Sequence, residues 1–194
     1  MTGSQASQRE IIGVFGSAAG LEEVEQLTPS VLGGWMGMGP RVGEFERRFG
    51  ERLGAGFVML DCASNAQHAA VAALELPPGS EIVVPAMTFV ACANAVALTG
   101  HQPVFCDVDL ETQNVRAEDV ERVRTNRTAA VMVVHYAGKP VRLDEFGALD
   151  LPIIEDAAHA VDSSLGQAPC GTLGTVGVFS FDSMKNLATP DGGA

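Results

Sequence analysis

The stretch AAVMVVHY at Ala129–Tyr136 decides the fold class of this chain. Its apolar and largely β-branched side chains predict a buried strand. Five further strands are expected, at Phe57–Asp61, Glu81–Val84, Pro103–Val108, Pro152–Glu155 and Val176–Phe181. Helix-like segments separate the strands, so the connections are expected to be right-handed crossovers. The sequence therefore predicts an α/β protein with a three-layer, mostly parallel sheet that helices cover on both faces.

A stripe of apolar residues after Pro40 predicts one of these helices. Val42, Phe45, Phe49 and Leu53 recur every three or four residues, and Pro40 suits the first position of a helix. The other helices are expected at Leu21–Leu32, Asn65–Leu76, after Thr88, at Arg116–Arg124 and near Arg142–Leu149. The glycine-rich segment at residues 33–39 must be a loop.

Composition and charge exclude several classes of function. A net charge of −12 without a basic cluster opposes a nucleic-acid partner. No apolar run reaches the length of a membrane span, and the polar residues 1–10 lack the apolar core of a signal peptide. The cysteines lie in apolar sequence without a paired ligand motif, which predicts reduced thiols and no metal site. We therefore expect a cytoplasmic protein without a membrane partner. The four cysteines are Cys62, Cys92, Cys106 and Cys170.

The residues that follow each strand are the candidates for a ligand site, because open α/β sheets bind ligands beyond the carboxyl ends of their strands. Ala63 and Ser64 open a helix after the first strand, where free N–H groups and a hydroxyl suit a phosphate. Ser64 can instead, or also, be the N-cap of that helix. Phe89 follows the second strand, and it is either a core residue or a stacking platform for a flat ring.

Two later strands end in residues with acid–base chemistry. Asp156 follows a buried apolar strand, where its carboxylate either caps a helix or pairs with a cation or a protonated ring nitrogen. His159 can point the same way or be a structural histidine. Lys185 follows the last strand in the segment SFDSMKN at residues 180–186. It is either a solvated lysine or, when buried, a nucleophile towards a carbonyl.

These groups together fit pyridoxal phosphate. A phosphate cup, a ring platform, an acid for the ring nitrogen and a lysine for the aldehyde follow successive strands. The cofactor acts as an electron sink when the acid keeps its pyridine nitrogen protonated. The sequence therefore predicts a pyridoxal-phosphate site at the carboxyl edge of the sheet.

The chain resembles the DegT/DnrJ/EryC1/StrS family of pyridoxal-phosphate-dependent sugar aminotransferases. The matching segments are collinear from about residue 12 to the end of the chain. They are GWMGMGP at 34–40 with EFE at 44–46, VPAMTF at 84–89, VHYAG at 134–138, IEDAAH at 154–159, GVFSF at 177–181, KNL at 185–187 and GGA at 192–194. The resemblance implies the large domain of a fold-type-I transferase, with active sites at a homodimer interface.

The resemblance also implies a role for each candidate residue. Lys185 corresponds to the lysine that forms the Schiff base, and Asp156 to the acid that pairs with the pyridine nitrogen. Phe89 takes the position of the stacking aromatic, and His159 that of the residue contacting the ring hydroxyl. Three positions match residues that hold the phosphate: Ala63, Ser64 and Ser180.

The implied reaction transfers an amino group from an amino acid, glutamate by family precedent, to a nucleotide-linked keto-sugar. A sugar dehydratase of the same family is the nearest alternative, but relatives of that kind lack the lysine, so Lys185 favours the aminotransferase. A non-catalytic regulatory or interaction protein is the alternative from another class.

Three departures from the family pattern bear on these expectations. Cys62-Ala63-Ser64 replaces the usual Ser-Gly-Thr, and alanine lacks glycine's access to positive φ. Asp182-Ser183-Met184 replaces the usual residues before the lysine, and its acid is expected to alter either the lysine or a substrate contact. The chain ends nine residues after Lys185, whereas family members continue. We therefore expect residues 1–194 to hold the N-terminal segment and most of the cofactor-binding large domain, incomplete at its C-terminus, without the small C-terminal domain.

Overall fold

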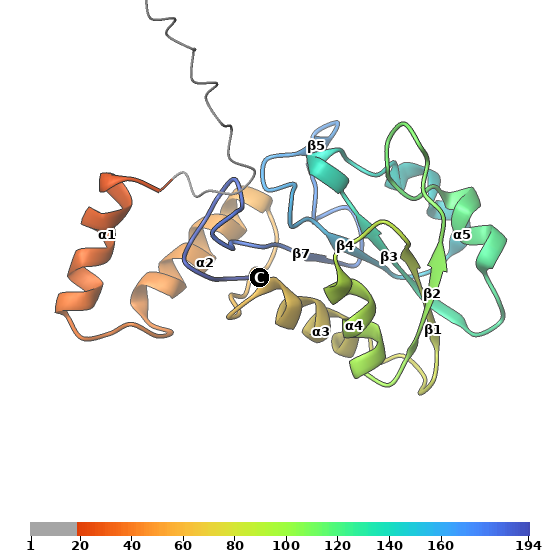
Figure 1. Ribbon diagram of the computed structural model, residues 1–194, viewed down its shortest axis with the longest axis horizontal. Helices are drawn as coiled ribbons and strands as arrows, with labels where there is room; N and C mark the ends of the chain where they lie inside the picture. The colour runs from red at the N-terminus through yellow and green to blue at the C-terminus, as the bar shows by residue number, and fades with distance from the viewer. Residues whose placement is uncertain (1–18) are drawn as a thin grey trace, which may run out of the picture.

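A five-stranded parallel sheet forms the centre of the computed structural model, which describes residues 19–194 (Figure 1). The expected polar lead-in at residues 1–10 lies outside the described residues. The strand order is β2-β1-β3-β4-β7, and each neighbouring pair is parallel, as the alternation of strands and helices predicts. The strands are β1 (Glu81–Pro85), β2 (Gln102–Cys106), β3 (Thr128–Val134), β4 (Ile153–Asp156) and β7 (Val176–Val178). A small hairpin of β5 (Ser164–Leu165) and β6 (Ala168–Pro169) stands apart from this sheet.

The helices occur where the sequence predicts them. They are α1 (Leu21–Leu32), α2 (Pro40–Leu53), α3 (Ala63–Ala73), α4 (Val90–Leu98) and α5 (Ala117–Val123). The short helix expected near Arg142–Leu149 is instead a pair of 3-10 turns, η2 (Leu143–Glu145) and η3 (Gly147–Leu149), and a third turn, η1 (Tyr136–Gly138), follows β3.

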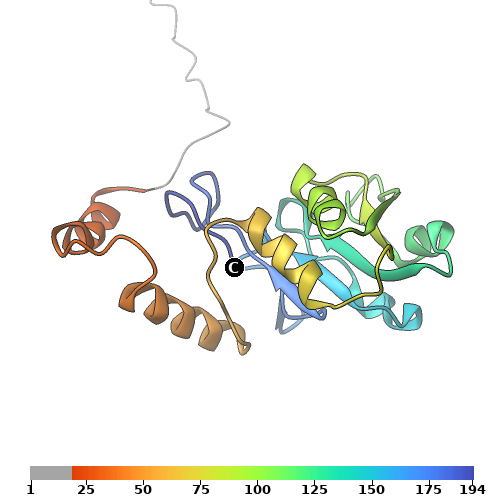
Figure 2. The same ribbon diagram turned by 90° about the horizontal axis from the view of Figure 1, so that it is seen from below.

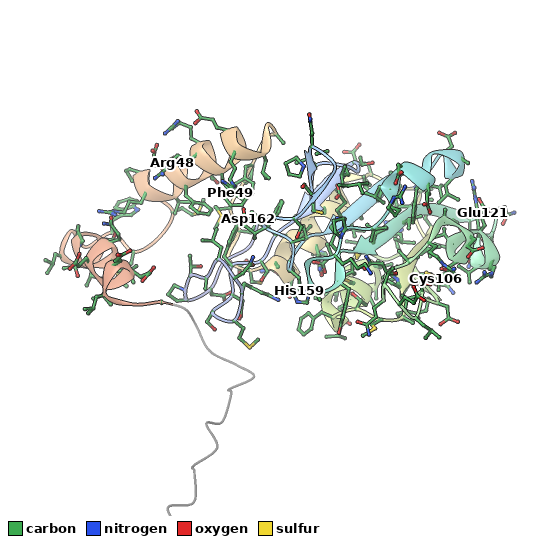
Figure 3. The ribbon with its side chains drawn as sticks, turned by 90° about the horizontal axis from the view of Figure 1, so that it is seen from above. Arg48, Phe49, Cys106, Glu121, His159 and Asp162 are labelled. Atoms are coloured by element: carbon green, nitrogen blue, oxygen red, sulfur yellow. The ribbon has the colours of Figure 1, made fainter. Side chains whose placement is uncertain are left out.

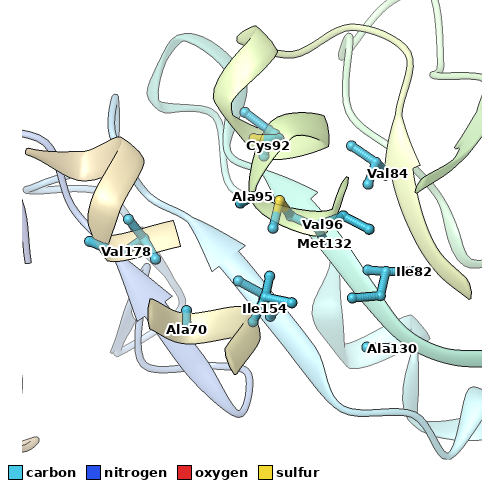
Figure 4. Packing of buried hydrophobic residues seen from close by; sticks show 13 residues of the cluster. Ala70, Ile82, Val84, Cys92, Ala95, Val96, Ala130, Met132, Ile154 and Val178 are labelled. Carbon is cyan, nitrogen blue, oxygen red and sulfur yellow. The ribbon is translucent and has the colours of Figure 1, made fainter. Parts of the chain in front are cut away.

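The two faces of the sheet bury different sets of side chains, because neighbouring residues of a strand point to opposite faces. Ala130 and Met132 of β3 pack towards α3 and α4, together with Ile82 and Ile154 (Figure 4). Val131 and Val133 belong to the opposite cluster, which α5, η2 and η3 cover. Figure 2 shows these helices on the two sides of the sheet. The predicted three-layer arrangement is therefore confirmed.

The predicted first strand at Phe57–Asp61 is wrong. Only Leu60 pairs, in an isolated antiparallel bridge with Gly193. The segment at residues 192–194 runs antiparallel to residues 179–181 on its other side, and Gly193 also bridges Ser180. Phe57 and Met59 pack into a cluster with α2, and Leu60 packs against the core of the main sheet, so their apolar character reflects burial rather than strand pairing. The predicted strand Val176–Phe181 ends as β7 at Val178, because residues 179–181 bond to residues 192–194 instead of to the main sheet.

Five phenylalanines join α2 to the segment that leads to Lys185. Phe45 and Phe49 lie on the apolar stripe of α2, and their ring centroids are 5.3 and 5.6 Å from that of Phe181. Phe57 and Phe179 complete the cluster, with centroids 4.7 and 5.6 Å from that of Phe49. Phe181 is fully buried, so the chain just before the lysine is firmly fixed.

Candidate active site

The candidate residues gather at the carboxyl edge of the parallel sheet. Asp156 is the last residue of β4, and it pairs in register with Val134 of β3 and Val178 of β7. His159 follows β4 (Figure 3), and Phe89 and Ser180 follow β1 and β7. The sheet therefore brings the ends of three distant segments to one edge, as the sequence predicts.

The two neighbouring carboxylates of β4 point to opposite sides of the sheet. Glu155 is fully buried, and one of its oxygens lies 2.8 Å from His135 Nε2. The same carboxylate accepts the N–H groups of Gly171 at 2.8 Å and Leu173 at 2.7 Å. Since these bonds fix a loop of the opposite layer, Glu155 is a structural residue. The acid available to a ligand is Asp156.

The Asp156 carboxylate is buried and held by three donors. Its Oδ1 accepts the N–H of Ala158 at 2.9 Å. Its Oδ2 accepts the amide Nε2 of Gln67 at 2.6 Å and lies 3.2 Å from Cys92 Sγ. No helix begins at residues 157–163, so the helix-cap alternative for Asp156 is wrong. Gln67 and Cys92 are absent from the predicted site; the available signal was a polar residue four positions after Ala63 on the inner face of an alanine-rich helix.

His159 is held in a defined tautomer by the loop that follows β3. Its Nδ1 accepts the N–H of Ala137 at 3.3 Å, so the proton of the neutral ring resides on Nε2. Ala137 has a left-handed backbone with φ 51°, which is uncommon for a non-glycine residue. Burial lowers the pKa of His159, the nearby Lys185 charge lowers it further, and Asp156 opposes the shift. His159 is therefore a neutral N–H donor at neutral pH, close to both Lys185 and Asp156.

The first turn of α3 lies beside Ser180, although 116 residues separate Ser64 from Ser180. Gly193 bridges both Leu60 and Ser180, and a Cβ at Gly193 would clash with the backbone nitrogen of Ala63. The N-cap position is Cys62, so the N-cap alternative for Ser64 is wrong. Among residues 19–194 no side chain caps α3, which leaves the N–H groups of its first turn available to an anion.

Lys185 is half-buried at the end of a short turn that Asp182 organises. Asp182 Oδ1 accepts the N–H of Met184 at 3.0 Å, and its carbonyl accepts the N–H of Lys185 at 2.8 Å. In the described part of the chain, Asp182 forms no ion pair with Lys185, so this departure from the family pattern shapes the turn. The sequence contains one other lysine, Lys139, which is exposed.

Phe89 is 70% exposed at the N-cap position of α4. The core alternative for Phe89 is therefore wrong. An aromatic face of this kind at the site edge is free to stack on a flat ring.

The donor set fits pyridoxal phosphate. Asp156 offers a buried carboxylate for a protonated ring nitrogen, His159 an N–H donor, Lys185 an amine and Phe89 an exposed ring. The first turn of α3 offers unpaired N–H groups for a phosphate. No cluster of His, Cys, Asp and Glu able to hold a metal occurs in residues 19–194.

A hollow of the described chain adjoins the site without containing it. This cleft of about 920 Å³ lies between α2 and the residues after Lys185, and Arg41, Arg48 and Leu187 are among its lining residues. None of the predicted site residues lines it. The chemistry of the side chains, rather than the size of a cavity, locates the site.

The model of the DegT/DnrJ/EryC1/StrS aminotransferase family matches residues 18–194. This chain belongs to that family. It is 41% identical over 181 residues to the dTDP-4-dehydro-2,3,6-trideoxy-D-glucose 4-aminotransferase of Saccharopolyspora spinosa, an alignment that covers 90% of this chain and 47% of the relative. The chain thus spans about half the length of this relative.

Solved structures of family members have the same fold. The aminotransferase TlmJ from Streptoalloteichus hindustanus is 42% identical with a TM-score of 0.89, over 95% of this chain and 52% of that protein. The putative sugar aminotransferase Spr1654 from Streptococcus pneumoniae, solved in PLP and PMP forms, is 26% identical with TM-scores of 0.88 and 0.89, over 94% of this chain and 52% and 51% of those chains. Pyridoxal phosphate is the cofactor of this family.

A dehydratase is also among the similar structures. The GDP-4-keto-6-deoxymannose-3-dehydratase ColD, solved as a mutant with bound GDP-perosamine, is 27% identical with a TM-score of 0.86, over 93% of this chain and 50% of that protein. The fold therefore serves more than one reaction on nucleotide sugars, and the site residues must distinguish them.

In residues 19–194, no helix combines the length and the apolar character that a membrane span requires.

Proposed function

We propose that the full-length protein is an aminotransferase that uses pyridoxal phosphate to move an amino group from an amino acid to a nucleotide-linked keto-sugar. Glutamate is the proposed donor. The observation that carries the proposal is the convergence of Lys185, His159 and Asp156 at one edge of the sheet, close enough for both charges to act on His159. The relatives that act on dTDP- and GDP-linked sugars support the substrate class.

Each residue of the site has a defined part in this proposal. When bound, pyridoxal phosphate supplies the electron sink that stabilises negative charge at the substrate carbon. Lys185 would hold the cofactor through its amine, and the same amine would act as the general base that moves a proton at that carbon. Asp156 faces the ring nitrogen and keeps it protonated. His159 donates its Nε2–H to the ring hydroxyl.

Three further groups position the cofactor in the proposed site. Ala63 and Ser64 offer the N–H groups of the first turn of α3 to the phosphate, and the Ser180 hydroxyl supports them. Phe89 stacks on the ring. These contacts would orient the cofactor and so place the substrate carbon near Lys185.

The two lysines of the chain allow a direct test. Borohydride reduction of the full-length protein with pyridoxal phosphate should attach the cofactor to Lys185, identified by peptide mass spectrometry. Lys185→Ala should abolish the visible cofactor band and lower glutamate-dependent turnover by about a thousandfold or more. Lys139→Ala, which removes the exposed lysine, should leave both unchanged. Retention of the band and of turnover in Lys185→Ala would disprove the assignment.

The alternatives receive less support. The dehydratases of this family lack the lysine that this chain contains at Lys185. A purely regulatory protein would have no need for a buried carboxylate beside a neutral histidine and an amine. Loss of the cofactor's yellow colour when glutamate is added would support the aminotransferase. A panel of keto-sugar nucleotides would then identify the acceptor.

We further propose that the protein acts as a cytoplasmic homodimer. The helix α1 (Figure 1) contains no buried residue, and its exposed side chains include an apolar face. That face consists of Leu21, Val24, Leu27 and Val31, which are all exposed. A second copy of the protein can cover this surface. All four cysteines are free, which agrees with a reducing compartment.

A further inference from the structure

Gln67 is a polar residue on the apolar inner face of α3. It is 2% exposed, and the other buried residues of this helix are Ala66, Ala70 and Val71. Figure 4 shows Ala70, one turn further along the helix, packed over the sheet. A leucine would fit this cluster without burying a polar group. The buried amide of Gln67 therefore requires a hydrogen-bond partner.

The Asp156 carboxylate is the main hydrogen-bond partner of this amide. Gln67 Nε2 donates to Asp156 Oδ2 at 2.6 Å, while Gln67 Oε1 is buried without a partner among the described residues. The amide nitrogen also lies 3.4 Å from Cys92 Sγ, so the carboxylate and the thiol orient the amide together, and one of its own polar atoms remains unsatisfied. A bond to an ionised acceptor is the stronger kind, which explains why this orientation prevails.

Cys92 of α4 approaches the same oxygen from the other side. Its Sγ lies 3.2 Å from Asp156 Oδ2 and accepts the Thr88 hydroxyl at 2.9 Å. Burial and then the Asp156 charge raise the pKa of the Cys92 thiol, so the thiol keeps its proton and donates a hydrogen bond to the carboxylate. Two donors from two helices thus fix one oxygen of Asp156.

We propose that Gln67 is a positioning residue that holds the Asp156 carboxylate towards the ring nitrogen of pyridoxal phosphate. This inference rests on the proposed function. Ala63 and Gln67 are four residues apart, so they lie on the same face of α3. One helix therefore fixes both ends of the cofactor: its first turn binds the phosphate, and Gln67 orients the acid at the ring nitrogen.

The test compares Gln67→Leu and Gln67→Glu with His68→Leu, a control at the exposed neighbouring position of the same helix. The full-length protein is titrated with pyridoxal phosphate, and the absorbance of the bound cofactor is followed against pH. His159 also titrates beside Asp156, Lys185 lies near His159, and Cys92 stays protonated, so all variants are compared over the same pH range.

Gln67→Leu should raise the dissociation constant for pyridoxal phosphate by about tenfold, because a bond to a charged group is lost. The pH midpoint of the cofactor absorbance should move as well. Gln67→Glu should have the larger effect, since a second carboxylate repels Asp156. His68→Leu should match the wild type in both measurements.

An unchanged dissociation constant and pH midpoint in Gln67→Leu would overturn the proposal. If Gln67→Leu does not fold, the unbranched Gln67→Met replaces it, and failure of both to fold would show that Gln67 serves the fold rather than the cofactor. Absence of a cofactor band in the wild type would overturn the proposed function together with this inference. A normal wild-type band with unaffected Gln67 variants would overturn the inference alone.

Discussion

Three separate influences act on the pKa of His159. Burial lowers this pKa most, the Lys185 charge lowers it next, and the Asp156 charge raises it. A neutral His159 donates from Nε2, because its Nδ1 accepts the N–H of Ala137. The hydrogen-bond role of His159 therefore depends on the charge of a lysine that lies 26 residues further along the chain.

Replacement of Lys185 by alanine should raise the pKa of His159. The substitution removes the second of the two influences that lower the pKa, while Asp156 continues to raise it. An NMR titration of the imidazole Cε1–H groups measures the shift, with His159→Gln to assign the signal. Lys139→Ala is the matched control and should leave the His159 titration unchanged. An identical titration curve in Lys185→Ala would show that the lysine does not face His159.

The same pKa has a consequence for stability. Because the folded pKa is below the unfolded value of about 6.5, His159 binds protons more readily in the unfolded chain. Its contribution to stability is present above that unfolded value and is lost as the pH falls below it. His159→Gln should therefore reduce the loss of thermal stability between pH 7 and pH 5, as calorimetry can measure.

At the scale of single elements, the phenylalanine cluster connects α2 to the lysine turn. Phe181→Ala should lower the free energy of unfolding by about 3–5 kcal/mol, since this side chain is fully buried in ring contact with Phe45, Phe49 and Phe57. Chemical denaturation measures the loss. Phe105→Ala, at an exposed position of β2, is the control and should change stability by less than about 1 kcal/mol. Equal losses in the two variants would contradict the anchoring role of the cluster.

The parallel sheet could be predicted from sequence because its strands are short apolar runs between helices, as in β3. The site could be predicted as far as it depends on strand ends, which topology places at one edge. The strand predicted at Phe57–Asp61 was wrong because side chains buried against α2 give the same apolar sequence pattern as side chains buried in a sheet. Gln67 was missed because its contact with Asp156 joins residues 89 positions apart. The local pattern of α3 places Gln67 on the same face as Ala63, but it does not show which distant residue the amide contacts.

At the scale of the whole molecule, α1 and α2 lie to one side of the three-layer body (Figures 1 and 2). The apolar face of α1 has no covering partner among the described residues. Leu27→Glu should therefore weaken the proposed homodimer at least about tenfold, because a charge replaces apolar surface at the contact. Sedimentation velocity over a range of concentrations measures the change.

The matched control adds the same charge elsewhere on the helix. Gln26→Glu changes the adjacent exposed position, which lies off the apolar face, and it should leave the association constant unchanged. If both variants associate as tightly as the wild type, the dimer contact lies on another surface.

The double pairing of Gly193 has a consequence for how the protein is made. Leu60 bonds to Gly193, and the residues on either side of Ser180, Phe179 and Phe181, bond to Ala194 and Gly192. The two halves of the proposed phosphate cup therefore depend on a piece of chain that leaves the ribosome after both of them. The helix α3 can form early, but its first turn reaches its final position only after residues 192–194 have been synthesised. Contacts between residues so far apart in the sequence form slowly. Nascent chains stalled before residue 192 should therefore hold a collapsed sheet that does not yet bind pyridoxal phosphate.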